Sequence, residues 1–168
     1  MACQPSQSVS ERECLDFQLE YCWKPFSVCR KQLTFRQHCS SRLCQADCNY
    51  WGPAVYKWQG VLNEGEHRGQ MGVYFGETGD LRARVKQYVS GTQERGNKLV
   101  REEFLTKGEI YLYVLDSFVL RSKWSHFTSD FHDLSLCGAN VRLVLEQLLV
   151  WREVAKGEGN TWIVNRKL

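Results

Sequence analysis

The clearest pattern of apolar and polar positions lies in residues 49–168, where short apolar stretches alternate with polar, glycine-containing connections. The stretches "GPAVYKWQGV" and "MGVYFGET" are typical of strands, and the polar connection "LNEGEHRGQ" between them predicts a hairpin. Pro53 is expected near the start of the first strand, where its missing N–H is tolerated. A third stretch, "EIYLYVLDSFVL", is the clearest strand, because it is rich in β-branched and aromatic residues.

Three other stretches carry the signals of helices. "DLRARVKQYV" follows the second strand, with Thr78 or Asp80 as its candidate N-cap. "GNKLVREEFLTKG" is expected to stop at Gly108, and "NVRLVLEQLLVWREVAKG" to run from a cap at Asn140 to Gly157. The order β-β-α-α-β-α predicts a small mixed α/β domain of the α+β class, with a three-stranded antiparallel sheet flanked by helices.

Residues 1–48 differ from the rest, because they are rich in cysteine and carry few strand signals. In "SERECLDFQLEYCW", Ser10 has the character of a helix cap, with Glu13 three residues later and apolar residues following. We therefore expect a cysteine-rich, mainly helical N-terminal extension over residues 1–48, followed by one folded domain over residues 49–168.

Length, composition and charge limit the class of protein. The chain has 168 residues, of which 43% are apolar and 12% aromatic, enough for one domain with a hydrophobic core. The formal net charge of +3 permits a nucleic-acid partner without requiring one. No apolar run is long enough to span a bilayer, and the first residues lack the features of a signal peptide. We therefore expect a soluble intracellular protein without a membrane partner, located in the cytoplasm, at the nucleoid or in a eukaryotic nucleus.

The cysteines raise the question of a metal site, since seven of the eight precede residue 49. The tightest cluster, "HCSSRLCQADC", offers the zinc-ligand types His38, Cys39, Cys44 and Cys48. Its spacing lacks a C-x-x-C pair, so reduced thiols that behave as small apolar residues are favoured over structural Zn²⁺. Another group of zinc-ligand types lies in a polar stretch and is favoured less; it consists of His126, His132 and Cys137.

Five side chains are candidates for chemistry, and each also has an ordinary explanation. Arg84 and Tyr88 lie four residues apart and share one face of their predicted helix, as a solvated cation beside an aromatic residue also would. Glu146 interrupts an otherwise apolar helix, either on its exposed face or at a binding cleft. Tyr56 and Tyr74 occupy matching positions in adjacent predicted strands, as residues in cross-strand packing do.

The string "VYFGETGDLRARVKQY" resembles the second signature block of the GIY-YIG nuclease superfamily. That block consists of Tyr-Ile-Gly, a short turn, Asn or Asp followed by Leu, and an Arg three residues later. The matching residues in this chain are Tyr74, Gly76, Asp80, Leu81 and Arg84. Several residue types and spacings must coincide for this match, so the block is fairly specific.

The resemblance extends over about residues 52–165. The first block, Gly-Ile-Tyr, has a weaker counterpart in "AVY", which ends at Tyr56. The acid that the family carries on a helix is matched by Glu146, and its late Asn by Asn160. Tyr88, four residues after the Arg, is the residue type of the excision-repair endonuclease subgroup.

The resemblance implies an endonuclease that hydrolyses phosphodiester bonds of DNA with a single Mg²⁺ or Mn²⁺. Glu146 would hold the metal ion, Arg84 would bind phosphate oxygens, and Tyr56 would act as general base. Tyr74 and Tyr88 would orient water or phosphate. The remaining implied site residues are Gly76, which lets the backbone approach the phosphate, and Asn160, which braces the site.

The chain departs from the family pattern in three places, and two other functions stay open. The connection around residues 60–70 is longer than usual, Glu77 stands where some members have Lys, and Asn165 competes with Asn160 for the late position. One alternative function is a catalytically inactive nuclease fold that binds DNA. The other is an interaction protein organised by zinc at the N-terminal cysteines.

Overall fold

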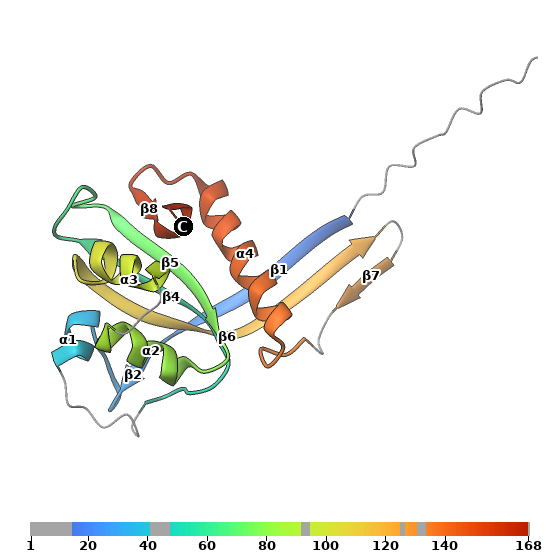
Figure 1. Ribbon diagram of the computed structural model, residues 1–168. Helices are drawn as coiled ribbons and strands as arrows, with labels where there is room; N and C mark the ends of the chain where they lie inside the picture. Colours follow the sequence, from blue (N-terminus) through green and yellow to red (C-terminus); the bar gives the residue numbers. More distant parts are fainter. Residues whose placement is uncertain (1–14, 41–47, 92–94, 125–126, 131–133, 168) are drawn as a thin grey trace, which may run out of the picture.

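The computed structural model describes residues 15–40, 48–91, 95–124, 127–130 and 134–167. Its main feature is a curved six-stranded sheet (Figure 1), in which the strand order is β1-β6-β4-β5-β8 and β7 pairs with β6. Neighbouring strands are antiparallel, except that β5 and β8 are parallel. The strands of this sheet are β1 (Leu15–Pro25), β4 (Ala54–Leu62), β5 (Met71–Thr78), β6 (Gly108–Trp124), β7 (Phe127–Asp130) and β8 (Thr161–Ile163).

Helices cover both faces of this sheet. One face is covered by α1 (Phe35–Ser40), α2 (Leu81–Ser90), α3 (Arg95–Val100) and the π-helical turn Arg101–Leu105, and the other by α4 (Ala139–Lys156). The smaller elements are the two-stranded sheet of β2 (Ser27–Val28) and β3 (Lys31–Gln32) and the 3₁₀ turn Val164–Lys167. No helix in these described segments is both long and apolar enough to cross a membrane.

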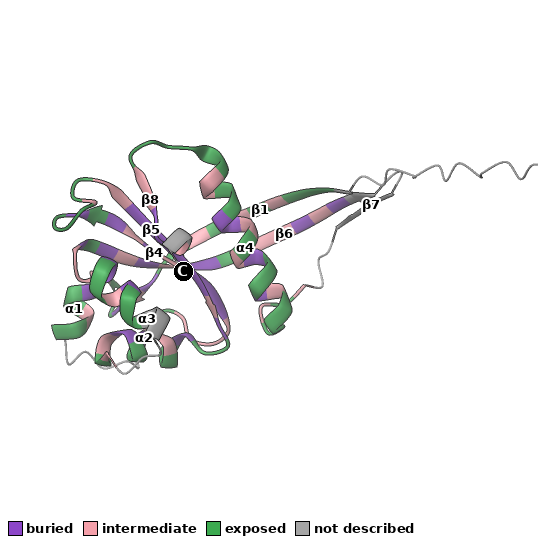
Figure 2. Cartoon of the chain, turned by 45° about the horizontal axis from the view of Figure 1, so that its top comes forward, coloured by how far each residue is buried: buried purple, intermediate pink, exposed green. Residues whose placement is uncertain are grey.

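The central strands are buried on both faces, because each face packs against a different set of helices (Figure 2). Successive side chains of a strand point to opposite faces. Tyr56 and Trp58 of β4 therefore join the core beneath α1 and α2. Val55 of β4 and Phe75 of β5 join the core beneath α4.

The predicted three-stranded antiparallel sheet is wrong. The three expected strands do form and lie side by side in the order β6-β4-β5. The sheet is larger because β1 and β7 pair with β6, and because β8 adds a parallel edge to β5. A parallel neighbour joined through a long connection cannot be recognised from the local pattern of either strand.

The predicted helical N-terminal extension is also wrong in the part that the structure describes. Residues 15–25 form β1, which pairs with residues 113–124 of β6. The two strands lie on opposite sides of residue 48, where the sequence predicted the end of the N-terminal extension. The apolar residues of β1 recur at every second position, which is the period of a strand rather than of a helix. They are Leu15, Phe17, Leu19, Tyr21 and Trp23. The capping signal that suggested a helix, Ser10 with Glu13, lies outside the described residues.

The turn between β5 and α2 forms much as its sequence predicts. Thr78 Oγ1 accepts a hydrogen bond from the N–H of Asp80 at 3.1 Å, and the Asp80 carboxylate caps α2 by accepting from the N–H of Ala83 at 3.0 Å. Gly91 ends the helix with a φ of 70°, which a residue with a side chain rarely adopts. This cap fixes where α2 begins relative to β5.

Candidate active site: tyrosines from three elements beside Arg84 and Glu146

Tyr56 and Tyr74 lie on the same face of the sheet. In the pairing of β4 with β5, Tyr56 lies opposite Gly76 and Tyr74 lies opposite Trp58. Both tyrosines belong to the core beneath α2, and they are 1% and 8% exposed respectively. The two phenols that the sequence places in matching strand positions are thus directed toward the same helix.

Tyr88 completes a cluster of three tyrosines. It is fully buried on the inner side of α2, and its hydroxyl lies 3.2 Å from that of Tyr56. A hydrogen bond also joins the side chains of Tyr74 and Tyr88. Phenol groups from β4, β5 and α2 therefore form one connected network.

Gly76 is required by the position of the Tyr56 ring. A Cβ atom at Gly76 would lie 2.5 Å from both Cζ and Oη of Tyr56, far inside van der Waals contact. The Tyr56 ring therefore packs against β5 at a residue that has no side chain. The sequence interpretation assigned Gly76 to an approach of the backbone to phosphate, whereas the structure shows that it makes room for a tyrosine.

Burial raises the pKa of each of the three phenols above its ordinary value. A neighbouring phenol adds to this shift for each of the three, whereas the charge of Arg84 acts against it for all three. The tyrosines are therefore neutral hydrogen-bonding groups at neutral pH. Arg84 is the neighbouring cation that favours loss of a proton from them.

Glu146, on α4, is near enough to this cluster for its charge to act on it. Burial, together with the neighbouring Glu77, raises the pKa of its carboxyl to about 7, against the lowering effect of Arg84. Its charge also acts on Tyr56 and Tyr74 and raises their pKa. Within the described part of the chain, no hydrogen bond or ion pair engages the Glu146 carboxylate.

Arg142 holds the first turn of α4 against the end of β5. Its side chain is only 8% exposed, and its Nε lies 2.8 Å from the Glu77 carboxylate. A second nitrogen of the guanidinium donates to the backbone carbonyls of Leu136 at 2.8 Å and Cys137 at 3.0 Å. Because Glu146 is one helical turn beyond Arg142, this anchor brings Glu146 to the end of β5.

Arg142 is a residue that sequence reasoning missed. It lies four residues before Glu146 and so shares one side of α4 with it, and the structure buries it. The one signal in the sequence was a cation in the first turn of an otherwise apolar helix. Its partner Glu77 is 65 residues away in the chain, so local spacing did not reveal the pair.

The two candidates for the late Asn differ in their contacts with β5. Asn160 is exposed, and only its backbone carbonyl takes part, by accepting from the N–H of Met71 at 3.0 Å. The Asn165 side chain accepts from the N–H of Phe75 at 2.8 Å and donates to the carbonyl of the same residue at 2.9 Å. Asn165 thus holds β5 at the residue between Tyr74 and Gly76.

The candidate zinc ligands are not brought together as a set among the described residues. The His38 ring packs against Phe26 and Trp58, and burial lowers its pKa to about 4. Cys39 is exposed, Cys48 is half-buried, and the described segments contain no group of three metal-ligating side chains. Cys44 lies outside the described residues, as do His126 and His132 of the second candidate group, whereas Cys137 is exposed.

The structure thus brings together six of the seven residues that the resemblance implies for the site, and it places Asn160 away from them. The six are Tyr56, Tyr74, Gly76, Arg84, Tyr88 and Glu146. No family model matches the chain, and no curated protein and no solved structure matches it either. The relation to the GIY-YIG nuclease superfamily stays a prediction that rests on the residues themselves.

Proposed function

We propose that this chain is a metal-dependent endonuclease that hydrolyses phosphodiester bonds of DNA. The observation that supports the proposal is the convergence of the three phenols, Arg84 and Glu146 at the end of β5. These side chains come from four separate elements, and their residue types are those that phosphodiester hydrolysis requires. The requirements are a place for a cation, a fixed positive charge for phosphate and groups that transfer or orient protons.

Glu146 fits a single divalent cation such as Mg²⁺ or Mn²⁺. Its carboxylate is half-buried and close to Glu77, so a cation beside it would relieve both the cost of burial and the repulsion between the two acids. A hard cation that keeps several of its waters needs only one or two protein carboxylates. When bound, such an ion supplies a nucleophilic water and stabilises the charge that develops on phosphate.

Arg84 provides the fixed positive charge at the site. A guanidinium group stays protonated at any physiological pH, and its planar fork matches two oxygens of a phosphate. The Arg84 charge already acts on Glu146 and on the three tyrosines. It is therefore close enough to receive a phosphate group that lies beside them.

Tyr56 is the proposed general base, and its environment sets the condition for that role. Because burial raises its pKa, Tyr56 loses a proton only when positive charge increases beside it. Arg84 and a cation at Glu146 are the two sources of such charge. The hydroxyl of Tyr88, 3.2 Å away, can donate to the phenolate that forms, and Tyr74 donates to the same network or to phosphate.

A cleavage assay tests this function. The protein is incubated with supercoiled plasmid and with branched DNA, with Mg²⁺ or with EDTA, alongside the variants Glu146→Gln and Arg84→Ala. We expect nicking or cleavage only with the wild-type chain and metal ion. Circular dichroism and a melting curve show whether the variants remain folded. Absence of cleavage by the wild-type chain on every substrate, or full activity of folded Glu146→Gln, would refute the enzymatic function.

A second function, DNA binding without hydrolysis, is favoured by the burial of the phenols. Tyr56, Tyr74 and Tyr88 are between 0% and 8% exposed, as residues with a purely structural hydrogen-bond network would be. In that case DNA binding would weaken with salt, and the folded protein would cut no substrate. The same assay, combined with a binding measurement at two salt concentrations, separates the two functions.

A further inference from the structure

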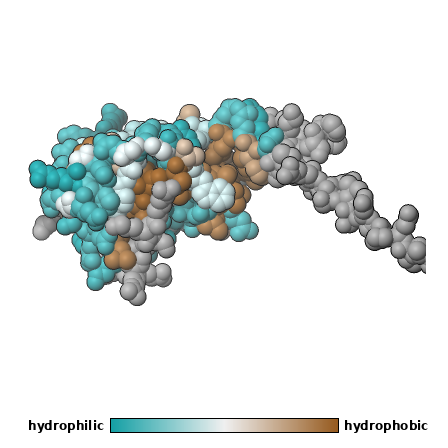
Figure 3. All heavy atoms as spheres, turned by 90° about the horizontal axis from the view of Figure 1, so that it is seen from above, coloured by the Kyte–Doolittle hydropathy of each residue, from teal (hydrophilic) through white to brown (hydrophobic). Residues whose placement is uncertain are grey.

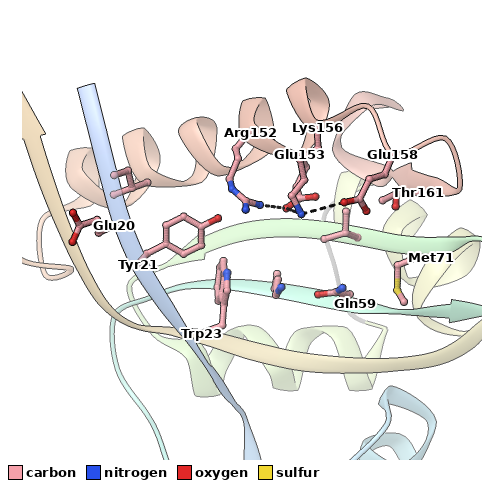
Figure 4. Close-up of a pocket in the computed structure, with 13 residues that line it drawn as sticks. Glu20, Tyr21, Trp23, Gln59, Met71, Arg152, Glu153, Lys156, Glu158 and Thr161 are labelled. Carbon is pink, nitrogen blue, oxygen red and sulfur yellow. Dashed lines mark hydrogen bonds and ion pairs between the residues drawn. The ribbon is translucent and has the colours of Figure 1, made fainter. Parts of the chain in front are cut away.

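A hollow lies away from the tyrosine cluster, between α4 and β1 (Figure 4). Its volume is about 630 Å³, its floor is formed by β4 and β5, and its walls carry side chains of β1 and of the last turns of α4. In Figure 3, which views the molecule from above, most of the surface is hydrophilic, and apolar surface gathers in its middle and toward the β1–β6 ribbon.

Three cations and three carboxylates line the hollow. The cations are Lys57, Arg152 and Lys156. Arg152 contacts the Glu153 carboxylate at 2.8 Å, and Lys156 lies 3.7 Å from the same carboxylate and 3.6 Å from that of Glu158. The third acid that lines the hollow, Glu20, forms an ion pair with Arg121, which is not one of the lining residues. Because Arg121 engages Glu20, the acids that face the three cations most directly are Glu153 and Glu158, and a phosphate in the hollow would take their place at Arg152 and Lys156.

Two aromatic rings of β1 line the hollow in an edge-to-face arrangement. Tyr21 and Trp23 lie with their ring centroids 6.1 Å apart at an interplanar angle of 80°. Lys57 lies 5.0 Å from the centroid of the Trp23 ring, and Arg152 lies 5.6 Å from that of Tyr21. The cations are thus held beside the rings, so that one ligand could contact an aromatic surface and a positive charge together.

The hollow and the tyrosine cluster share two structural elements. Lys57 follows Tyr56 in β4 and therefore points to the opposite face of the sheet. Glu153 follows Glu146 by two turns of α4, on the same side of the helix and about 10 Å farther along its axis. A chain of nucleotides that passes the end of β5 could therefore continue along α4 into the hollow.

We propose that this hollow binds a short single-stranded segment of DNA, with a base against Trp23 and Tyr21 and a phosphate at Arg152 and Lys156. The combination of aromatic rings with cations along a groove is typical of proteins that bind single strands. A hollow of this volume is in the range of about 300–1,000 Å³ that encloses ligands of nucleotide size. The proposal rests on the proposed function, because it assigns the hollow to the strand that leaves the cleavage site.

Binding can be measured separately from cleavage. The parent protein is Glu146→Gln in EDTA, and the probes are a fluorescent twelve-nucleotide single strand and a duplex of the same length, followed by fluorescence anisotropy. We expect tighter binding of the single strand. Trp23→Ala should weaken it roughly 5- to 100-fold, which corresponds to the loss of one stacked base. The double variant Arg152→Ala/Lys156→Ala should weaken it at least as much and lower the salt dependence.

Two further variants sharpen the test. Glu153→Gln removes a negative charge from the hollow without shortening the side chain, so binding should become tighter. Lys31→Ala is the matched control, because Lys31 is an exposed cation on the separate sheet of β2 and β3. The Lys31→Ala variant should bind the single strand with the same affinity as the parent protein. The proposal is refuted if the folded Arg152→Ala/Lys156→Ala variant binds as Lys31→Ala does, or if the duplex binds more tightly.

The outcome is distinguishable from failure of the proposed function. Strand binding that depends on the hollow, in a wild-type protein that cuts nothing, would refute the nuclease and leave this site in place. Cleavage by the wild-type protein that is unchanged in the hollow variants, with unchanged strand affinity, would refute this site and leave the nuclease in place.

Discussion

Replacement of Gly76 by Ala tests the packing at the centre of the tyrosine cluster. The added methyl group would lie 2.5 Å from Cζ and Oη of the Tyr56 ring, so the ring or the β5 backbone must move. Overpacking of a buried site costs about 1–3 kcal/mol. The movement also separates the hydroxyls of Tyr56 and Tyr88, and a buried hydroxyl left without its partner costs about 1–3 kcal/mol more. We therefore expect Gly76→Ala to lower the free energy of unfolding by about 2–6 kcal/mol.

Urea unfolding followed by circular dichroism measures this loss, and Gly79→Ala is the matched control. At Gly79 the nearest atom to an added methyl group is a guanidinium nitrogen of Arg142 at 3.6 Å, which is ordinary contact. The control should therefore change stability by less than about 1 kcal/mol. A cycle with Tyr56→Val tests the cause, because the cost of Gly76→Ala should largely disappear when the ring is absent. Equal stability of Gly76→Ala and Gly79→Ala would refute the reasoning.

Three other predictions concern the groups around the cluster. Because burial raises the pKa of Glu146 from 4.5 to about 7, the folded state binds the proton more tightly, and stability should fall as pH rises between those values. In Glu146→Gln this component of the pH dependence should be absent, as urea unfolding at several pH values would show. Arg142→Ala removes a buried guanidinium that pairs with the Glu77 carboxylate, whose side chain is 29% exposed, and it should cost about 1–3 kcal/mol, measured in the same way. Asn165→Ala removes two hydrogen bonds to β5 and should cost about 1–3 kcal/mol, whereas Asn160→Ala should change stability by less than about 0.5 kcal/mol.

Each of these three has a result that contradicts it. An identical pH dependence in the wild-type chain and in Glu146→Gln would show that this carboxyl is not the group that titrates. Arg142→Ala with wild-type stability would mean that the ion pair across α4 and β5 contributes nothing. Greater loss from Asn160→Ala than from Asn165→Ala would reverse the assignment of the late Asn.

Local patterns in the sequence predicted the elements that carry most of the site. The runs that became β4 and β5 have turn residues on both sides, and α2 has its cap at Asp80 and its end at Gly91. These signals depend on residues a few positions apart, so one chain is enough to read them. The segment before residue 48 was misread because a capping signal at Ser10 was given more weight than the two-residue period of β1.

The rest of the site depends on contacts between distant residues, which no local pattern records. The pair of Arg142 with Glu77 joins the start of α4 to the end of β5 across 65 residues. The choice between Asn160 and Asn165 depends on the pairing of β8 with β5, which places residue 161 opposite Met71 and lets the chain reach Phe75 a few residues later. In both cases the residue type was visible in the sequence, and the partner was not.

The parallel pairing of β8 with β5 has a consequence for synthesis of the protein. The strand that carries Tyr74 and Gly76 acquires its outer neighbour and its brace at Phe75 only from residues 161–165. On a ribosome, the hairpin of β4 and β5 is made many seconds before those residues leave the exit tunnel. Until β8 has been made, the outer edge of β5 has no neighbouring strand, and the tyrosine cluster is not yet fully supported. A chain stalled before residue 161 would carry nearly all the site residues and still lack the finished site.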